Sequence, residues 1–331
     1  MKKHKICKIL LVILAIFLCV AFYELLGICV AYKKQPEVSN TTKKETKNGS
    51  WNECSENTER AVIIEKNPEA LLQRVRLIKN AKKEIILSTF AFQSDESGKL
   101  ILGALHDAAD RGVHIRLLVD GMESWIDMEG NPYFYGLSSH ENVEIKLYNK
   151  ANPLKPWKMM GRMHDKYLIA DGKRYILGGR NTYNYFLGDF PGHKNYDRDV
   201  LVVCDEPEKE NSVNQLLEYF ETIWEQEDSG YFHDNKKLAN RKSVKNAVLE
   251  LQNGYQKYFE ENKERICDTD YTDETFETEK IALVSNPIHT GSKEPVVWYQ
   301  LGELMKNAKN RVKIHTPYII CNDMMYNTWE E

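Results

Sequence analysis

Residues 162–181 decide the fold, and they read RMHDKYLIADGKRYILGGRN. Two short apolar stretches flank a turn at Asp171-Gly172, a composition typical of a β-hairpin. Alternate side chains of a strand point to the same face of a sheet, so we expect His164 and Lys166 to lie side by side. The stretch therefore predicts a hairpin that carries an imidazole and an ammonium group at its starting edge.

The glycine pair that ends the hairpin indicates a place for a ligand. Gly178-Gly179 allows the backbone to approach closely, and Asn181 follows with a side-chain amide that can donate hydrogen bonds. An ammonium group and an amide would hold the non-bridging oxygens of a phosphate group, while the imidazole attacks phosphorus or moves a proton. The segment thus predicts phosphate chemistry at His164, Lys166 and Asn181.

Helices and short apolar strands alternate on both sides of this hairpin, which predicts a layered α/β sheet flanked by helices. The expected helices cover residues 71–81, 100–111 and 211–226. The expected strands cover residues 84–92, 113–119, 143–147, 166–169, 175–177 and 200–204, and an apolar run at 281–284 indicates one more. We take residues 61–226 as a first domain.

A short internal repeat indicates a second copy of this unit. Residues 77–92 and 304–319 are identical at six of sixteen positions, at a constant offset of 227 residues. We interpret the repeat as a duplication whose first half is complete and whose second half is partial. On this interpretation residues 227–280 are a charged connecting segment, and residues 281–331 begin an incomplete second domain.

The N-terminus is expected to anchor the chain in a membrane. Residues 9–32 form an apolar run broken only by Glu24; as a helix they would measure about 36 Å, against about 30 Å for a bilayer core. A cleaved signal peptide is the alternative, but the run is long for one and no convincing small-x-small cleavage site is present. We therefore expect a single transmembrane helix within residues 1–32 and a polar linker over 33–60.

The basic residues around this helix bear on its orientation. Four lysines precede the apolar run and four follow it before residue 45, so the positive-inside comparison is close. A very short basic tail is easiest to leave in the cytoplasm. We therefore expect the body of the protein outside the cytoplasm, at the cell membrane.

The charge balance argues against nucleic acid as a partner. The sequence has 45 Lys and Arg residues against 49 Asp and Glu residues, a net charge of −4 to which residues 1–32 contribute +3. The body thus carries −7, whereas affinity for nucleic acid depends on basic side chains that neutralise phosphates. The cysteines of the body have no C-x-x-C spacing, so no metal site is expected, and disulfide pairing stays open: Cys54, Cys204, Cys267 and Cys321.

The hairpin resembles the signature of the phospholipase D superfamily, H-x-K-x4-D-x6-G-[SG]-x-N. Every fixed position is present, with Gly179 at the variable place: His164, Lys166, Asp171, Gly178 and Asn181. The flanking residues 178–181, 185–186 and 197–200 are similar to those of bacterial cardiolipin synthases, especially the C-type group. The resemblance extends from about residue 61 to the end of the sequence.

The resemblance implies a phospholipase D-like fold and a two-step phosphoryl transfer without metal or cofactor. His164 would be the nucleophile and form a phosphohistidine, and Lys166, Asn181 and Gly179 would bind the phosphate. The implied substrate is a phospholipid similar to phosphatidylglycerol, so the membrane is the implied site of reaction.

Two acidic residues complete the implied site. Asp197 matches the carboxylate that orients the nucleophilic imidazole and stabilises its cationic form. Asp171 belongs to the catalytic motif, although a structural role is favoured for it.

Sites of this superfamily combine two such motifs, from two halves of one chain or from two identical subunits. No other histidine of this sequence begins an H-x-K-x4-D pattern, and the repeat places the second motif near residue 391, beyond Glu331. Either the sequence is truncated, which we favour, or two chains pair as a homodimer. We expect a phosphatidyltransferase that turns over poorly alone; the alternatives are a homodimeric phospholipase D or nuclease, and a non-catalytic lipid-binding fragment.

Overall fold

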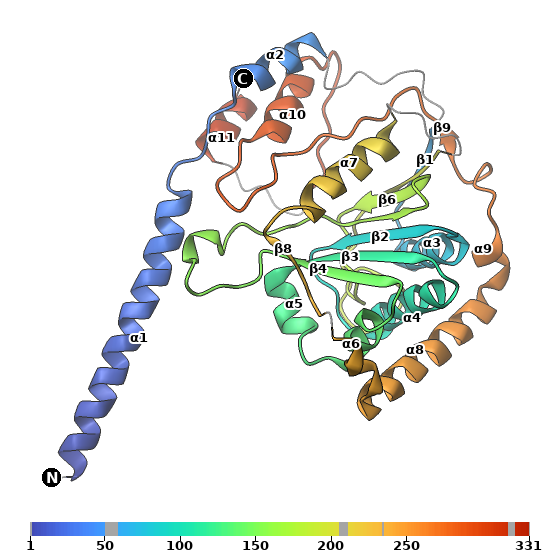
Figure 1. Cartoon of the computed structure of the whole chain (residues 1–331). Coiled ribbons are helices and arrows are strands. Elements are labelled where there is room, and N and C mark those ends of the chain that lie inside the picture. Colours follow the sequence, from blue (N-terminus) through green and yellow to red (C-terminus); the bar gives the residue numbers. More distant parts are fainter. Residues whose placement is uncertain (1, 50–58, 205–210, 234, 317–321, 331) are drawn as a thin grey trace.

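One mixed sheet of nine strands runs through the computed structural model, which describes residues 2–49, 59–204, 211–233, 235–316 and 322–330 (Figure 1). The order of the strands across the sheet is β8-β4-β3-β2-β5-β6-β7-β1-β9. They are β1 (Arg60–Ile64), β2 (Glu84–Thr89), β3 (His114–Asp120), β4 (Val143–Tyr148), β5 (Tyr167–Ala170), β6 (Arg174–Gly178), β7 (Asp199–Val203), β8 (Ser229–Tyr231) and β9 (Phe276–Glu277). The six strands predicted between residues 84 and 204 are confirmed, each within a few residues of its expected bounds.

The sheet brings several strand ends together at one edge. β2 pairs parallel with β3 and antiparallel with β5, so the carboxyl ends of β2 and β3 lie at the same edge as the start of β5. β6 pairs antiparallel with both β5 and β7, so the end of β6 and the start of β7 lie there too. Ligands of open α/β sheets bind beyond the carboxyl ends of the parallel strands. The hairpin motif therefore lies at the edge where this class of sheet accommodates a ligand.

Helices cover both faces of the sheet, which confirms the predicted layered α/β fold (Figure 1). One face carries α3 (Asn67–Asn80), α4 (Glu96–Asp110), α6 (Pro132–Ser138) and α8 (Lys242–Glu261), and the other carries α7 (Ser212–Trp224). Alternation along β5 divides its side chains between two apolar cores: Leu168 packs toward α3 and α4, whereas Tyr167 and Ile169 pack toward α7. By the same alternation, His164 and Lys166 belong to the face of α3 and α4.

Residues 227–280, expected to be a connecting segment, add elements to this same layered unit. β8 extends the sheet beside β4, and β9 extends it beside β1. α8 packs against α4 and α6, and α9 (Lys263–Cys267) packs against α3. The polar composition of the segment reflects the outer faces of these elements.

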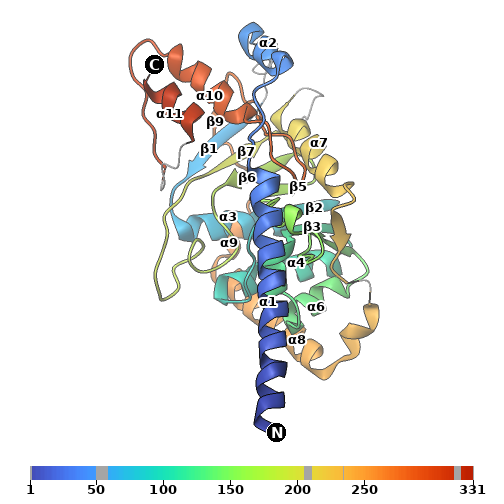
Figure 2. The ribbon, with the colours of Figure 1, turned by 90° about the vertical axis from the view of Figure 1, so that its left-hand side faces the viewer.

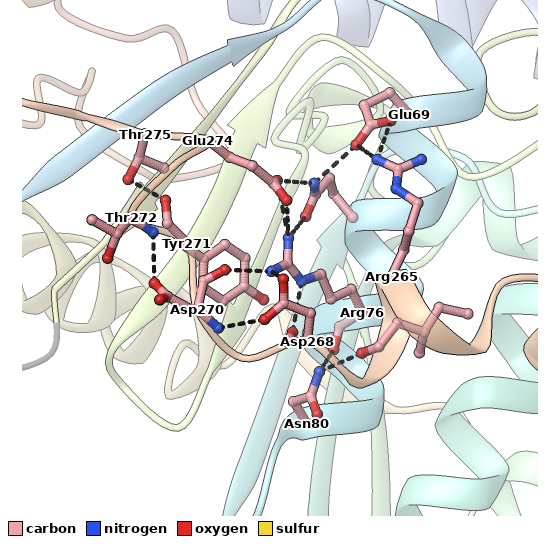
Figure 3. A network of polar contacts seen from close by, with 12 residues as sticks. Glu69, Arg76, Asn80, Arg265, Asp268, Asp270, Tyr271, Thr272, Glu274 and Thr275 are labelled. Atoms are coloured by element: carbon pink, nitrogen blue, oxygen red, sulfur yellow. Dashed lines mark hydrogen bonds and ion pairs between the residues drawn. The ribbon is translucent and has the colours of Figure 1, made fainter.

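Arg76 of α3 fastens the chain that follows α9, as Figure 3 shows. Its guanidinium donates to the carbonyl oxygens of Asp268 and Asp270 and pairs with the carboxylates of Asp268 and Glu274, at 3.3 and 2.9 Å. It also lies 3.9 Å from the centre of the Tyr271 ring. Arg76 is 1% exposed, so these contacts replace water at a buried cation.

The strand expected at 281–284 is absent from the described part of the chain, and so is a counterpart of β2 in the repeat. Residues 281–284 are irregular. Ile281 and Leu283 pack against the core on the α7 face, so their apolar side chains are half-buried there without a strand pairing in the described residues. Residues 311–316, which the repeat aligns with β2, are irregular as well, although α10 (Val296–Lys306) reproduces the helix before them. β2 is held between β3 and β5, whereas no described strand pairs with 311–316, and an unpaired strand is not stable in water.

α1 (Lys2–Tyr32) projects from the body as a long helix (Figures 1 and 2). Its residues Lys5–Tyr32 are long and apolar enough to cross a membrane, by length and composition only, and the most apolar window is not buried against the protein. In its last turns the half-buried residues recur every three or four positions, as Glu24, Gly27, Ile28 and Ala31. One face of this end therefore contacts the body.

The remaining described elements are short. They are α2 (Asn40–Asn48), α5 (Gly121–Asp127), η2 (Pro156–Lys158), η3 (Lys236–Asn240) and α11 (Asp323–Glu330). α2 lies within the expected linker, of which residues 50–58 are outside the described part. Within the described residues, neither the buried Cys204 nor the exposed Cys267 forms a disulfide, and Cys54 and Cys321 lie outside the described residues.

Candidate active site

Phe90, directly after β2, forms the surface on which the two motif side chains meet. The ring of His164 contacts the Phe90 ring edge-on, with centroids 4.6 Å apart and planes at 63°. The Nζ atom of Lys166 lies 5.2 Å from the centre of the same ring and donates a 2.6 Å hydrogen bond to the carbonyl oxygen of His164. The structure thus brings the imidazole and the ammonium group together on one face, as the alternation predicts.

Lys166 is a buried cation, only 6% exposed. Desolvation lowers the pKa of its ammonium group to about 8, against the attraction of Asp165, Asp197 and Asp120. Burial of a charge is unfavourable unless an opposite charge comes close. A bound phosphate group would supply that charge.

His164 stands at the solvent-exposed rim of the site. Partial desolvation lowers the pKa of its imidazole, the positive charges of Lys166 and Arg162 lower it further, and the charge of Asp120 raises it. The neutral imidazole carries the lone pair needed for attack on phosphorus. The surroundings of His164 therefore favour its nucleophilic form at neutral pH.

Asn181 and Gly179 approach the site from the end of β6. Asn181 is buried, and its Oδ1 accepts the backbone N–H of Ala91 at 3.2 Å, one residue after Phe90. This bond fixes the amide, and no described residue accepts a hydrogen bond from its Nδ2, which is left to donate to a ligand. A side chain at position 179 would overlap the carboxylate of Asp197 and displace it, so glycine allows this close approach.

Asp197 lies against Gly179 rather than against the imidazole. Its Oδ1 accepts the backbone N–H of Arg198 at 2.7 Å, and its charge raises the pKa of Lys166. Within the described residues no hydrogen bond joins Asp197 to His164. The structure therefore does not bring this carboxylate to the imidazole, and its charge acts on Lys166 instead.

Asp171 lies at the opposite end of the hairpin, in the turn between β5 and β6. Its carboxylate accepts the backbone N–H groups of Lys82, Lys83 and Glu84 at 2.7 to 3.1 Å. Along the strand it is roughly 16 Å from Lys166, at about 3.3 Å per residue. The structure does not bring Asp171 to the imidazole; it fastens the hairpin to the start of β2.

Sequence analysis missed Asp120, a buried acid at the end of β3. Its Oδ1 accepts hydrogen bonds from the Nε and Nη2 atoms of Arg162 at 2.8 and 2.6 Å, and its Oδ2 accepts the N–H of Met163 at 3.1 Å. Arg162 in turn lies 5.0 Å above the centre of the Phe90 ring. A signal was present in the sequence, because an acid at the carboxyl end of a buried parallel strand lies where such sheets bind ligands.

A cavity of about 390 Å³ adjoins the motif on the α7 face of the sheet. Its lining includes His164 and Lys166, and its polar groups include Asp165, Tyr219 and Lys293. Tyr219 donates to Asp165 at 2.7 Å; burial raises the pKa of Asp165 and lowers that of Lys293. Neither here nor elsewhere in the described residues do three or more His, Cys, Asp or Glu side chains form a group that could hold a metal ion.

Comparison with known proteins bears on the domain around this site. Residues 74–224 match the family model described as cardiolipin synthase, PLD-like domain. Cardiolipin synthase C of Escherichia coli (strain K12) is 29% identical over 171 residues, which cover 47% of this chain and 34% of that protein. An uncharacterized protein of Helicobacter pylori (strain J99 / ATCC 700824) is 30% identical over 212 residues, which cover 60% of this chain and 39% of that protein.

Similarity to solved structures is more distant. A phosphatidylserine synthase from Haemophilus influenzae Rd KW20 is 15% identical with a TM-score of 0.47, over 74% of this chain and 52% of that chain. The chain spans between about a third and about a half of the length of the curated relatives that it matches. Residues 74–224 of the chain therefore form a PLD-like domain of the cardiolipin synthase type.

Proposed function

We propose that this chain is a membrane-anchored phosphatidyltransferase of the cardiolipin synthase type, with His164 as its nucleophile. The observation that carries the proposal is that His164 and Lys166 both contact the ring of Phe90. The next residue, Ala91, donates the backbone hydrogen bond that fixes Asn181 beside them. Similarity to cardiolipin synthases supports a phospholipid substrate, and phosphatidylglycerol is the donor we propose. The length and composition of α1 support an anchor beside such a substrate. We place the body outside the cytoplasm because a very short basic tail precedes the apolar run.

The proposed reaction has two balanced steps. In the first, a ring nitrogen of neutral His164 attacks phosphorus. The bond from phosphorus to the oxygen of the headgroup glycerol breaks, and that oxygen takes a proton from a second acid, so that free glycerol leaves. In the second, the hydroxyl of an acceptor phospholipid attacks the phosphohistidine, the N–P bond breaks, and the hydroxyl proton returns to the same acid. Lys166 and Asn181 hold the non-bridging oxygens, where charge develops in both steps.

The second acid corresponds to the other motif histidine of the superfamily. No other histidine in this sequence stands in the H-x-K-x4-D pattern. We assign the acid to a second copy of this chain or to further residues of a longer protein. This assignment leaves the nucleophilic half of the reaction to His164 alone.

The nucleophilic half can be tested without the second acid. The p-nitrophenolate group leaves a phosphodiester without being protonated, so bis(p-nitrophenyl) phosphate should release up to one equivalent of nitrophenolate per chain. The phosphoryl group should remain as an acid-labile adduct that peptide mass spectrometry places on His164. His164→Asn should abolish the adduct, whereas His193→Asn, at an exposed loop position, should retain it. An adduct elsewhere, or one that persists in His164→Asn, would overturn the assignment.

The substrate is tested with the full chain in phosphatidylglycerol vesicles. Cardiolipin together with free glycerol supports the transferase, whereas phosphatidic acid together with glycerol indicates a phospholipase. Turnover per chain that rises with protein density in the vesicle indicates that a second copy supplies the acid. If neither cardiolipin nor phosphatidic acid forms when the chain is supplied with the second H-x-K-x4-D motif, the proposed substrate is wrong.

A further inference from the structure

We propose that the interfacial loop, residues 150–161 between β4 and β5, enters the membrane beside α1 and holds His164 at the level of the lipid headgroups. The proposal rests on the membrane anchor of the proposed function and adds a lipid-binding surface to it. The partner is an anionic lipid bilayer. Figure 1 shows this loop, in green, reaching from the body to α1.

The contacts of the loop with α1 set its depth. The hydroxyl of Tyr23 donates a 3.1 Å hydrogen bond to the carbonyl oxygen of Leu154, and Pro156 packs so closely on Gly27 that a larger residue there would overlap it. A hydrocarbon core of about 30 Å takes up about 20 helical residues, so a span that starts after Lys8 ends near residue 28. Tyr23 then lies roughly 7 Å below that boundary. Leu154, bonded to it, shares that depth.

The side chains that the loop exposes are those that a bilayer accepts. Leu154 is 77% exposed, Met160 58% and Trp157 45%. The neighbouring α5, whose first residue packs against the start of the loop, exposes Trp125 and Ile126 as well. Clustered exposed apolar side chains mark interaction sites, and tryptophan is enriched at the membrane interface. Because the loop contacts the apolar span through Leu154 and Pro156, its exposed side chains indicate lipid as the partner.

The backbone of the loop is prepared for an environment with little water. Hydrogen bonds within the loop satisfy several N–H groups, those of Leu154, Lys155, Lys158, Met159 and Gly161. Asn149 closes the base of the loop, because its Nδ2 donates to the carbonyl oxygens of Lys158 and Gly161 at 2.7 and 2.9 Å. Pro153 and Pro156 have no N–H group to satisfy. Unsatisfied backbone groups are what excludes most loops from lipid, and this loop has reduced them.

The charge of the loop selects the kind of bilayer. The loop has three lysines and no acidic residue. Lys158 pairs with Asp228 at 2.6 Å, and Lys150 donates to the carbonyl oxygen of Tyr231. We therefore assign Lys155 to the headgroups. A lysine near the surface of an anionic membrane is worth about 1 kcal/mol, and its long side chain lets the ammonium group reach the headgroups while the stem stays in the apolar layer. The proposed donor, phosphatidylglycerol, is itself anionic. The loop would therefore gather substrate where it inserts.

The position of His164 gives the loop its functional consequence. His164 follows Gly161 by three residues, which span at most about 11 Å of extended chain. The imidazole is therefore tied to the layer in which the phosphodiester of a lipid lies. The site can attack a phospholipid that has not left the bilayer.

The test measures contact of Trp157 with lipid in the full chain, reconstituted into phosphatidylglycerol and phosphatidylcholine vesicles with or without brominated acyl chains. Bromine quenches tryptophan fluorescence on contact. Trp157→Phe should lose part of the bromine-dependent quenching. Trp329→Phe is the matched control, because Trp329 is 42% exposed and lies on α11, beyond the C-terminal end of α1 (Figure 1). This variant should retain all of the bromine-dependent quenching.

Unchanged bromine-dependent quenching in Trp157→Phe would overturn the inference. The measurement does not need turnover, so its result separates from that of the proposed function. A chain without phosphatidyltransferase activity whose Trp157 contacts lipid keeps the inference and contradicts the activity. A chain that alkaline carbonate removes from the vesicles contradicts the anchor, and the inference fails with it.

Discussion

Arg162 donates two hydrogen bonds to a single carboxylate oxygen of Asp120, at 2.8 and 2.6 Å, while the other oxygen accepts the backbone N–H of Met163. Asp120 is 1% exposed, so this acid is held by its partners and not by water. One carboxylate therefore fixes both residues that precede His164. The position of the imidazole depends on a strand that the hairpin motif does not include.

Asp120→Asn keeps the shape of the side chain and removes its charge. The free energy of unfolding should fall by about 2 kcal/mol, because Arg162 loses its buried counter-charge and keeps Glu123 as its acidic partner, at 3.0 Å. The pKa of His164 should fall as well, since the charge of Asp120 now raises it. Chemical denaturation measures the first effect, and NMR titration of the imidazole measures the second. If the pKa of His164 rises or stays constant in this variant, the charge of Asp120 does not act on the imidazole.

Asp197→Asn distinguishes the effect of Asp197 on the site from that of Asp120. Asp197 raises the pKa of Lys166 and makes no hydrogen bond to His164, so the variant should lower the pKa of Lys166 and leave that of His164 in place. NMR titration of both side chains measures the shifts, with Asp120→Asn as the comparison. If the pKa of His164 shifted more in Asp197→Asn than in Asp120→Asn, Asp197 would have the orienting role expected from the family motif.

The hairpin and the central strands could be predicted from the sequence because their signals are local. Turn residues at Asp171-Gly172 and alternation of apolar side chains are readable within a few positions. The acid that acts on His164 could not be predicted in this way. In the sheet, β3 and β7 are equally far from β5, and Asp197 is nearer to the motif in sequence than Asp120. The chain from β4 to β5 decides between them, because it crosses the ends of β3 and β2 and delivers Met163 to Asp120.

Long-range packing explains the other differences from prediction. The strand expected at 281–284 rested on apolar character, but partial burial of Ile281 and Leu283 on the α7 face satisfies that character without a partner strand in the described residues. The polar composition of 227–280 concealed α8, because only one side of that helix is buried, at residues such as Leu251 and Tyr255. Both cases depend on which surfaces meet in the folded chain, which local patterns do not contain.

Lys166 predicts a pH dependence of stability with a defined sign. Burial lowers its pKa from 10.5 to about 8 in the folded chain. Below about pH 8 the ammonium group is charged in both states, so the folded chain carries the full cost of the buried charge. As the pH rises from about 8 to about 10.5, only the unfolded chain keeps the proton, and the free energy of unfolding should rise by on the order of 3 kcal/mol.

Lys166→Met provides the comparison for this pH dependence. Denaturant titrations of both proteins across pH 7 to 11 cancel the other titrating groups, and the difference between the two curves should show the rise. Inorganic phosphate should bind the wild-type chain more weakly above about pH 8, because the ammonium group loses its charge. A difference curve that is flat would mean that Lys166 is not a buried cation.

Asp171→Ala should reduce stability and leave the chemistry of the folded chain intact. The variant removes the acceptor of three backbone N–H groups at the start of β2, for which we expect a loss of about 2 kcal/mol. Asp171→Asn should lose less, because asparagine keeps an acceptor oxygen and tolerates the positive φ of 54° at this position. Nitrophenolate release per folded chain should stay close to wild type in both variants. Loss of the His164 adduct in stably folded Asp171→Asn would return Asp171 to the catalytic site.

Arg76→Met tests whether residues 268–275 belong to the first domain, as the contacts in Figure 3 indicate. The variant keeps an apolar stem of similar length and removes the donors to the carbonyl oxygens of Asp268 and Asp270 and to the carboxylate of Glu274. We expect the free energy of unfolding to fall by about 3 kcal/mol. Because the lost contacts join α3 to one segment, amide hydrogen exchange should accelerate most within 268–277. Proteolysis should cut the same segment sooner than in the wild type.

Arg265→Met is the matched control for Arg76→Met, because Arg265 also pairs with a carboxylate from this region of the fold but lies at the surface. Its contact with Glu69 is 2.9 Å long between side chains that are 55% and 31% exposed. Exposed ion pairs contribute about 0 to 1 kcal/mol, so this variant should unfold close to the wild type and keep its exchange pattern. Equal losses in the two variants would mean that burial of Arg76 adds nothing. Residues 268–275 would then be held by their other contacts, such as the hydrogen bond from Gln73 to Glu274 and the burial of Tyr271 in the core.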